Sequence, residues 1–207
     1  MNYGVYQNVR NAAWRCLLDA GITELPVSVT KIARHFDIRI AKNSVYGMLE
    51  SDQSGISFQT ESGEWLIVYD DSASTGRKRF TIAHELGHIL LGHPLREGER
   101  HTRVFNKDRP EVEKEADMFA ARILSPACVL WALDLHTPEE IAERCQISYT
   151  AAQARADRMA LLYSRQMFLT SPIERQVFQA FKPWIEQQKS RPAFVPGGNG
   201  EEKSQKR

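Results

Sequence analysis

Apolar residues recur at helical spacing over the first twenty positions of the chain, at Val5, Val9, Ala13, Cys16 and Ala20. This spacing predicts an amphipathic helix that ends at Gly21. A second, shorter helix is predicted around residues 29–36, and the segment 38–40 that follows it is typical of a strand. The chain therefore begins with helices and changes to strands near residue 38.

Two short apolar runs follow at residues 55–58 and 65–69, and the polar residues 61–63 lie between them. This arrangement predicts two strands joined as a hairpin. The sheet would lead directly into the apolar helical run of residues 79–91. An edge strand beside that helix could bind an extended peptide by main-chain hydrogen bonds, and the pattern leaves open which strand is the edge.

A further helix is predicted over residues 111–126. It ends at Pro126, and its buried stripe consists of Ala116, Ala120, Ile123 and Leu124. Further on, the segment 137–140 has the pattern of a capping box with proline at the first helical position. That helix breaks at residues 146–147, and Ser148 can cap a second helix that runs to about Tyr163. The spacing is typical of a helix-turn-helix.

A last helix is predicted to begin at Ser171 and Pro172, with an apolar face made of Val177, Phe178, Phe181, Trp184 and Ile185. Packing within the molecule is the default expectation for this face, although it could equally serve a partner or a dimer. Residues 192–207 are rich in glycine, proline and charge, and we expect them to be disordered.

The segment His84-Glu85-Leu86-Gly87-His88 lies inside the apolar run and has the pattern H-E-x-x-H. Two histidines four residues apart lie on one helix face, so both rings can reach a single metal ion, and Glu85 can act as a base toward water. Because a helix this apolar belongs to a core, burying these polar side chains requires a metal or hydrogen bonds. By itself the pattern also fits paired core histidines with ordinary hydrogen bonds.

A third ligand decides between these interpretations, because catalytic zinc takes three protein ligands and keeps one position for water. Glu113 lies three and seven residues before two members of the buried stripe of the 111–126 helix, and Asp117 lies on the same face. We therefore predict Glu113 as the third ligand and Asp117 as the residue that holds the second ring nitrogen of a ligand histidine. Glu115 is the runner-up, since it aligns with Glu111 toward the rim of that face.

Two further histidines lie near the motif. His93 follows His84 by nine residues, whereas the pattern H-E-x-x-H-x-x-G-x-x-H requires ten, so we interpret it as a helix-end residue. His101 lies in the charged segment 94–110 and is predicted to be in a solvated loop, with a role at the rim of a substrate cleft left open.

Length and composition fit one compact catalytic domain with or without a small satellite, since the chain has 207 residues of which 42% are hydrophobic. The charge balance, 27 − 26 = +1, provides no overall field for nucleic acid or an anionic membrane. No apolar run approaches the ~20 residues that span a bilayer, and the N-terminus lacks the pattern of a signal peptide, so we expect a cytoplasmic protein.

Cys16, Cys128 and Cys145 lie far apart and are predicted to be small core residues.

Charge also bears on the helix-turn-helix spacing. Between residues 137 and 165 four arginines balance four acids, namely Arg144, Arg155, Arg158 and Arg165 against Glu139, Glu140, Glu143 and Asp157. Recognition helices normally lie on a basic face, because phosphate contacts dominate affinity. The balance argues against direct DNA binding and favours a helical pair packed on the catalytic domain.

Residues 80–91, followed by Glu113-x-Glu115-Ala116-Asp117-x-Phe119-Ala120-Ala121-x-Ile123-Leu124-x-Pro126, resemble the paired signature of the ImmA/IrrE-type metallopeptidases. The resemblance covers roughly residues 25–165. It implies a gluzincin-like peptidase with Zn²⁺ held by His84, His88 and Glu113 and with Glu85 as the catalytic base. One departure is visible, because family members often carry Asn at the position of Asp117 and Met at that of Ser125.

The predicted fold is α+β: a zincin-like metallopeptidase domain over residues 1–135 with a small β-sheet packed on helices, a helical, helix-turn-helix-like extension over 136–190, and a tail over 191–207. Known members of the family cleave or inactivate helix-turn-helix repressors of stress or mobile-element genes. The resemblance therefore implies a zinc endopeptidase with one ion per chain that hydrolyses a peptide bond in a regulatory protein, such as an XRE-like repressor, in stress response or mobile-element control.

Two other functions stay open. One is a regulator that binds DNA or a repressor through residues 137–165 and uses its metal only structurally. The other is a toxin-antitoxin-type component that associates with a helix-turn-helix protein without cutting it. The sequence also leaves open whether the metal is zinc or manganese, which residue stabilises the oxyanion, and the oligomeric state.

Overall fold

The computed structural model describes residues 3–93, 101–102 and 111–190. Along the chain these residues form α1 (Tyr3–Asp19), α2 (Val29–His35), β1 (Arg39–Lys42), α3 (Asn43–Tyr46), β2 (Gly55–Gln59), β3 (Trp65–Tyr69), α4 (Thr75–Leu90), β4 (His101–Thr102), α5 (Glu111–Leu124), α6 (Ala127–Ala132), α7 (Pro138–Cys145), α8 (Tyr149–Ser164) and α9 (Pro172–Ser190). The α+β prediction is confirmed, with a small sheet packed on helices and a helical part after it.

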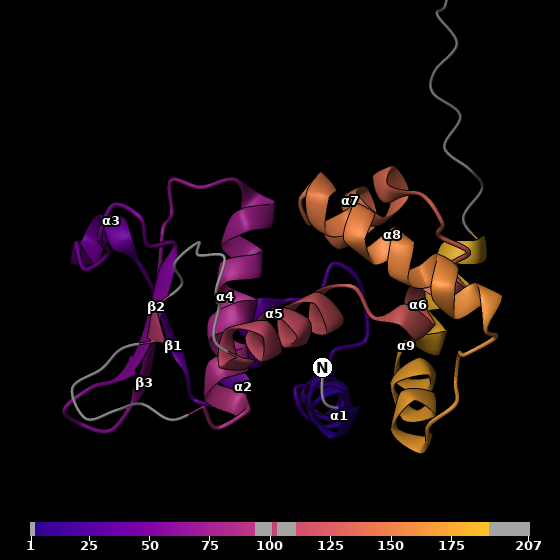
Figure 1. The fold of residues 1–207 in the computed structure, drawn as a ribbon, viewed down its shortest axis with the longest axis horizontal. Coiled ribbons are helices and arrows are strands. Elements are labelled where there is room, and N and C mark those ends of the chain that lie inside the picture. The colour runs from indigo at the N-terminus through magenta and orange to yellow at the C-terminus, as the bar shows by residue number, and fades with distance from the viewer. Residues whose placement is uncertain (1–2, 94–100, 103–110, 191–207) are drawn as a thin grey trace, which may run out of the picture.

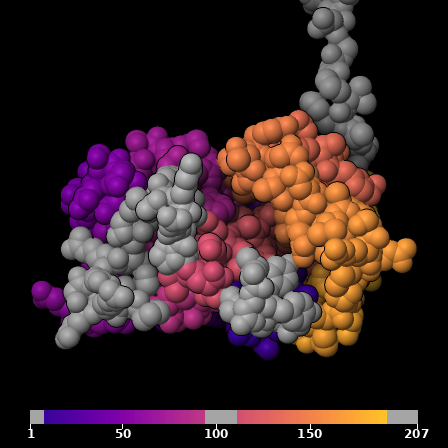
Figure 2. Space-filling model, viewed as in Figure 1, coloured from indigo at the N-terminus to yellow at the C-terminus, as the bar shows by residue number. Residues whose placement is uncertain are grey.

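The elements follow one another across the molecule as layers (Figure 1). The sheet lies at one end, and α4 packs against its strands β2 and β3. The next layer is α5, which packs on α4 and also on α1, and α9 then packs on α1 and α6. In the space-filling view, the surface of α7–α9 adjoins that of the first half of the chain (Figure 2). The helix that carries the H-E-x-x-H motif therefore lies between the sheet and the helical core.

The sheet has the strand order β1-β3-β2-β4 among the described residues. β2 and β3 pair antiparallel, which confirms the predicted hairpin, and β1 pairs parallel to β3. β4 joins the outer side of β2 with two residue pairs, Ile56 with Thr102 and Ser57 with His101. The edge strand beside β2 is thus a short one that the sequence pattern did not reveal.

Side chains alternate between the two faces of this sheet, as in any strand. Ile67 lies on the face covered by helices, and its neighbours Leu66 and Val68 belong to a separate small core with Ile56 on the opposite face. Ser57 pairs with Ile67 across the β2–β3 ladder, so it shares the helix-covered face. The pairing therefore places a serine hydroxyl directly under α4.

One large apolar core extends from Val9 on α1 to Ile185 on α9. The last helix contributes Val177 and Phe181, both fully buried, so its predicted apolar face packs within the molecule. Residues from both sides of position 135 belong to this core, and the division there into a catalytic domain and an extension stays a prediction. No helix in the described ranges is long and apolar enough to cross a membrane.

The paired helices after residue 137 begin and end as predicted. Thr137 and Glu140 form a capping box at the start of α7, with hydrogen bonds in both directions. Gln146 ends the helix in the left-handed conformation, with φ 52°, and the Ser148 hydroxyl caps α8 by accepting from Ala151 N. α3 and α6 were not predicted, and α9 continues through Pro183. The predicted disordered tail lies outside the described residues, as does most of segment 94–110.

All three cysteines are buried and free, as the sequence predicted. Burial raises the pKa of each thiol, of Cys16, Cys128 and Cys145 alike, to about 12. Thiolate, the reactive form of cysteine, is therefore scarce near neutral pH. A cysteine nucleophile has no support in this structure.

Candidate metal centre

The motif helix α4 is capped by Ser74, whose hydroxyl accepts from Arg77 N, and it ends before Gly92, which has φ 68°. Its residues 81–88 are all buried. Gly87 faces α5 so closely that a β-carbon there would lie 3.1 Å from Ala116 Cα. The absence of a side chain at Gly87 lets the two helix backbones approach, and this contact sets the distance between the ligands that each helix carries.

His84, His88 and Glu113 meet between α4 and α5. Their ligand atoms all lie within 4.8 Å of one another, and both histidines are at most 1% exposed. His84 Nε2 lies 3.0 Å from His88 Nε2, and the Glu113 carboxylate lies 3.3 Å from the first and 3.1 Å from the second. The structure brings together the three residues that the spacing argument selected.

A different residue holds the second ring nitrogen of each histidine. Asp117 Oδ1 lies 2.8 Å from His84 Nδ1, as expected from its place on α5. His93 performs this role for His88, since the two Nδ1 atoms are 2.9 Å apart, and His93 Nε2 in turn lies 2.9 Å from Glu115 Oε2. With both Nδ1 positions occupied, each Nε2 is directed to the shared centre.

Two sequence-based assignments change as a result. His93 does follow the end of α4, but it is 8% exposed and contacts a motif histidine, so it is more than a helix-end residue. Glu115, the runner-up ligand, lies outside the three-residue group and contacts His93 instead. Spacing alone missed this pair because residues 92 and 93 turn back toward α5 only in the folded chain. The side chain of His101 lies outside the described part of the structure.

Glu85 lies on the side of α4 that faces β2. It is fully buried, and its Oε2 accepts a hydrogen bond of 2.7 Å from the hydroxyl of Ser57, which is also fully buried. Gly55 on the same strand leaves room for the neighbouring Thr81 of α4, because a β-carbon there would clash with Thr81 Cγ2, whereas Glu85 Oε1 would lie at an ordinary contact distance of 3.5 Å. Ser57 was missed by the sequence analysis, and no local signal could have identified it, since it depends on strand register.

The electrostatics favour a charged carboxylate at the centre. Burial alone would raise the pKa of Glu113, but hydrogen bonds to His84 and His88 hold it well below its usual range. Burial lowers the pKa of both histidines; at His84 the hydrogen bonds to Asp117 and Glu113 outweigh this and raise it, whereas at His88 burial prevails. The centre therefore combines an anionic oxygen with imidazole nitrogens.

These observations fit a divalent metal ion. Two imidazole nitrogens and one carboxylate form a donor set that catalytic sites use, and three protein ligands leave a coordination position for solvent or substrate. Hydrogen-bonded outer residues behind each ligand histidine are typical of metal sites and are less expected for ordinary core histidines. His84, His88 and Glu113 could thus hold one metal ion.

A hollow of about 630 Å³ lies next to Asp117, the residue that holds His84 Nδ1, and the three ligands themselves do not line it. Asp117 and Phe80 line it on the side of the metal ligands, and the Phe80 ring centroid lies 6.5 Å from that of His84. The N-terminal part of α8, with Ala151 and Ala154, forms another wall. The walls combine small and apolar residues with polar ones such as Arg77 and Thr150, and a hollow of this kind can receive a side chain of a bound polypeptide.

Comparison with known proteins agrees with this geometry. The Peptidase_M78 family model, described as an IrrE N-terminal-like domain, matches residues 33–157. The matched range contains both motif helices, α7 and the first part of α8. No curated protein matches the chain closely enough to be counted as a relative. With more than half of its length matched and a His-His-Glu group between α4 and α5, the chain belongs to the IrrE N-terminal-like peptidase family and has a metallopeptidase-type function.

Proposed function

We propose that the chain is a zinc-dependent endopeptidase in which His84, His88 and Glu113 hold one Zn²⁺. The convergence of these three side chains within 4.8 Å, each histidine held from behind by a partner, is the observation that carries the proposal. When bound, zinc would supply Lewis acidity, which lowers the pKa of water and polarises a carbonyl group.

Glu85 is the general base of this proposal. A carboxylate beside the ligands can accept a proton from the attacking water and pass it to the leaving nitrogen. The hydrogen bond from Ser57 fixes the orientation of the carboxylate, and its burial excludes competing solvent. A metal site with a purely structural role has no need of a base at this place.

The remaining residues position the ligands. Asp117 orients the His84 ring, and the Glu115–His93 pair orients the His88 ring. Such outer partners fix the tautomer of a ligand histidine and raise its basicity.

We further propose that the substrate is a regulatory protein, namely an XRE-like helix-turn-helix repressor that acts in stress response or in mobile-element control. The resemblance to ImmA/IrrE-type peptidases supports this choice, and the 630 Å³ hollow with walls of α4, α5 and α8 has room for side chains of a polypeptide.

The test compares Glu85→Gln with the wild type in two measurements, metal content and cleavage of a purified XRE-like helix-turn-helix repressor. We expect both proteins to bind one zinc per chain with the same thermal stability, and only the wild type to produce fragments. Glu113→Gln should lose zinc as well as cleavage. Glu111→Gln, a matched change at an exposed position of the same helix, should behave as the wild type in both measurements.

The outcome also separates the alternatives. A repressor that stays intact with zinc-loaded wild type, but binds it and Glu85→Gln equally, would favour a non-proteolytic partner protein. Equal biological activity of wild type and Glu85→Gln in cells would favour a regulator whose metal is structural. Fragments from the wild type alone support the peptidase.

A further inference from the structure

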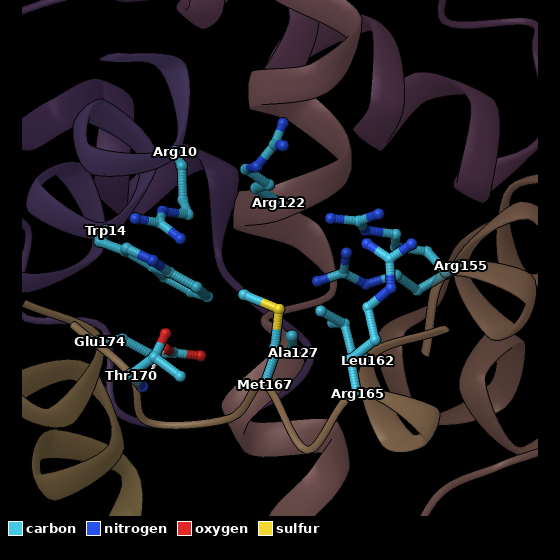
Figure 3. Close-up of a pocket in the computed structure, with 11 residues that line it drawn as sticks. Arg10, Trp14, Arg122, Ala127, Arg155, Leu162, Arg165, Met167, Thr170 and Glu174 are labelled. Atoms are coloured by element: carbon cyan, nitrogen blue, oxygen red, sulfur yellow. Dashed lines mark hydrogen bonds between the residues drawn. The ribbon is translucent and has the colours of Figure 1, made fainter. Parts of the chain in front are cut away.

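A second cavity lies where α1, the C-terminal half of α5, α8 and the segment after α8 meet (Figure 3). Its volume is about 170 Å³, and none of its lining residues belongs to the His-His-Glu group. Five arginines from three helices and the segment after α8 share its wall: Arg10, Arg122, Arg155, Arg158 and Arg165.

The wall carries a large excess of positive charge. A guanidinium group keeps its proton throughout the physiological pH range. Glu174 is the one carboxylate among the described residues that line the cavity, and these residues together carry a net charge of 5 − 1 = +4. Its Oε2 accepts a hydrogen bond of 3.1 Å from the backbone N of Thr170. Chain-wide, in contrast, the charge is only +1, so this concentration is local.

Burial makes the clustering of positively charged side chains energetically unfavourable. Arg122 is 9% exposed, and Arg155 and Arg158 are half-buried. The carbonyl oxygens of Met118 and Ser125 accept hydrogen bonds from Arg122 and Arg155, respectively. Among the described residues that line the cavity, Glu174 carries the negative charge that opposes these guanidinium groups, and an anion in the cavity would add to it.

Two buried hydrogen-bond donors at this cavity also favour a bound anion. Trp14 is 3% exposed and lines the cavity, and its indole Nε1 has no hydrogen-bond partner within the described part of the chain. The Nε of Arg10, on the same helix, is likewise buried without one. Buried donors without acceptors are rare and unfavourable, and here they border an arginine-lined space.

We propose that this cavity binds a compact dianion, either inorganic phosphate or the phosphoryl group of a small phosphorylated molecule. The planar fork of arginine matches the oxygens of phosphate in a bidentate manner. One water molecule needs only about 10–15 Å³ of volume measured in this way, so the cavity is large enough for a phosphoryl group. Arg165 is exposed, and a larger ligand would extend past it.

The geometry favours a small anion over nucleic acid. In Figure 3, Arg155 and Arg165 lie opposite Arg10 and Trp14, with Met167 between them. The arginines of α8 that a DNA reader would present on an outer face therefore line a cavity shared with α1. A duplex needs an accessible basic face along which its backbone can lie.

The test is titration of the zinc-loaded full chain with inorganic phosphate at fixed ionic strength, followed by calorimetry and by thermal unfolding. We expect one saturable site and a rise in the unfolding temperature, because the ligand binds only the folded chain. Sodium chloride at the same ionic strength should produce neither. A sugar phosphate titrated in parallel shows whether a phosphorylated molecule binds more tightly than phosphate itself.

Arg10→Gln and Arg158→Gln should each weaken phosphate binding by about tenfold or more, the loss expected for one charge-assisted hydrogen bond. Arg15→Gln is the matched control, since Arg15 is exposed on the same helix as Arg10 and does not line the cavity. Because phosphate can also ligate a metal, Glu113→Gln is titrated as well and should keep its phosphate affinity. This arm separates the anion site from the proposed peptidase.

The proposal is overturned by any of three results. One is a titration without saturation into the millimolar range. Another is equal weakening by Arg15→Gln and by the cavity variants. The third is salt-dependent binding of duplex DNA that the cavity variants abolish, in a protein that does not bind phosphate.

Discussion

Gly87 provides the sharpest test of the idea that helix spacing positions the metal ligands. It lies on α4 between His84 and His88, with its Cα against α5. Replacement by alanine adds one β-carbon, 3.1 Å from Ala116 Cα, 3.2 Å from Ala116 O and 3.3 Å from Phe119 Cβ. Two of these atoms belong to the backbone, so no side-chain rotation can relieve the contact.

The expected magnitude follows from these distances. Carbon atoms pack at about 3.5–4.0 Å, so α4 and α5 must separate by roughly half an ångström. Overpacking of this kind lowers the folding stability by about 1–3 kcal/mol. The higher helix propensity of alanine relative to glycine raises it by about 1 kcal/mol. The net loss of stability should be about 1 kcal/mol, or ~2–4 °C in Tm for a chain of this size.

The effect on metal binding should be larger than the effect on folding. Metal–ligand distances tolerate deviations of about 0.2 Å, so a helix shift of half an ångström moves Glu113 outside that range. We expect Gly87→Ala to weaken zinc binding by about 10–100-fold, as loss of an outer-shell partner does. Competition with a chromophoric chelator measures this affinity, and thermal unfolding of the metal-free chain measures the stability.

Gly76→Ala is the matched control on the same helix. Its β-carbon would lie 2.7 Å from Ser148 N and 2.9 Å from Ile147 C, which places the clash against the turn between α7 and α8. We expect a comparable or greater loss of stability with zinc affinity nearly unchanged. Normal zinc affinity in Gly87→Ala, together with weakened affinity in Gly76→Ala, would refute the reasoning.

Other predictions concern the residues around the centre and the C-terminal helices. Ser57→Ala removes a hydrogen bond to a buried carboxylate and should lower kcat by about tenfold or more with zinc affinity retained; a change in KM alone would contradict this role. His93→Ala should weaken zinc binding by about 10–100-fold as judged by chelator competition, because the His88 ring loses its partner. Removal of the metal with a chelator should lower Tm, and added zinc should restore it. Thr137→Ala should cost about 1 kcal/mol in urea denaturation through loss of the α7 cap, without an effect on zinc. Hydrogen bonds from the backbone of Thr137 and His136 lower the pKa of Glu140, so its contribution is present above its unfolded pKa and is lost as pH falls through the folded one. The stability difference between wild type and Glu140→Gln should therefore shrink below about pH 4.

The motif residues were accessible from sequence because helical geometry is local. His84 and His88 share a face by virtue of their four-residue spacing, and Glu113 and Asp117 could be assigned to the inner face of α5 from the apolar stripe that follows them. The capping box at Thr137 is equally local, since its partners are three residues apart. In each case the residues that determine the arrangement lie within one or two helical turns of one another.

Contacts between distant segments were not accessible in this way. Ser57 reaches Glu85 only because β2 and β3 pair in one register, and a slip by one residue would turn the hydroxyl to the other face. His93 meets His88 through the turn after α4, although the metal-ligand spacing rules had excluded it as a ligand. The arginine cavity joins Arg10 to side chains more than a hundred residues away, which no periodicity of the chain indicates.

The sequence by itself therefore indicated all helices except α3 and α6, which of their faces are apolar, and which residues could act as metal ligands and base. Tertiary structure alone decided how close α4 and α5 lie, which residues stand behind each histidine, and that arginines of α8 converge with those of α1 and α5 instead of forming an outer basic face. The physical reason is the range of the forces involved. Helix and cap formation depend on neighbours within about four residues, whereas packing and the burial of charge depend on whichever segments the core brings together.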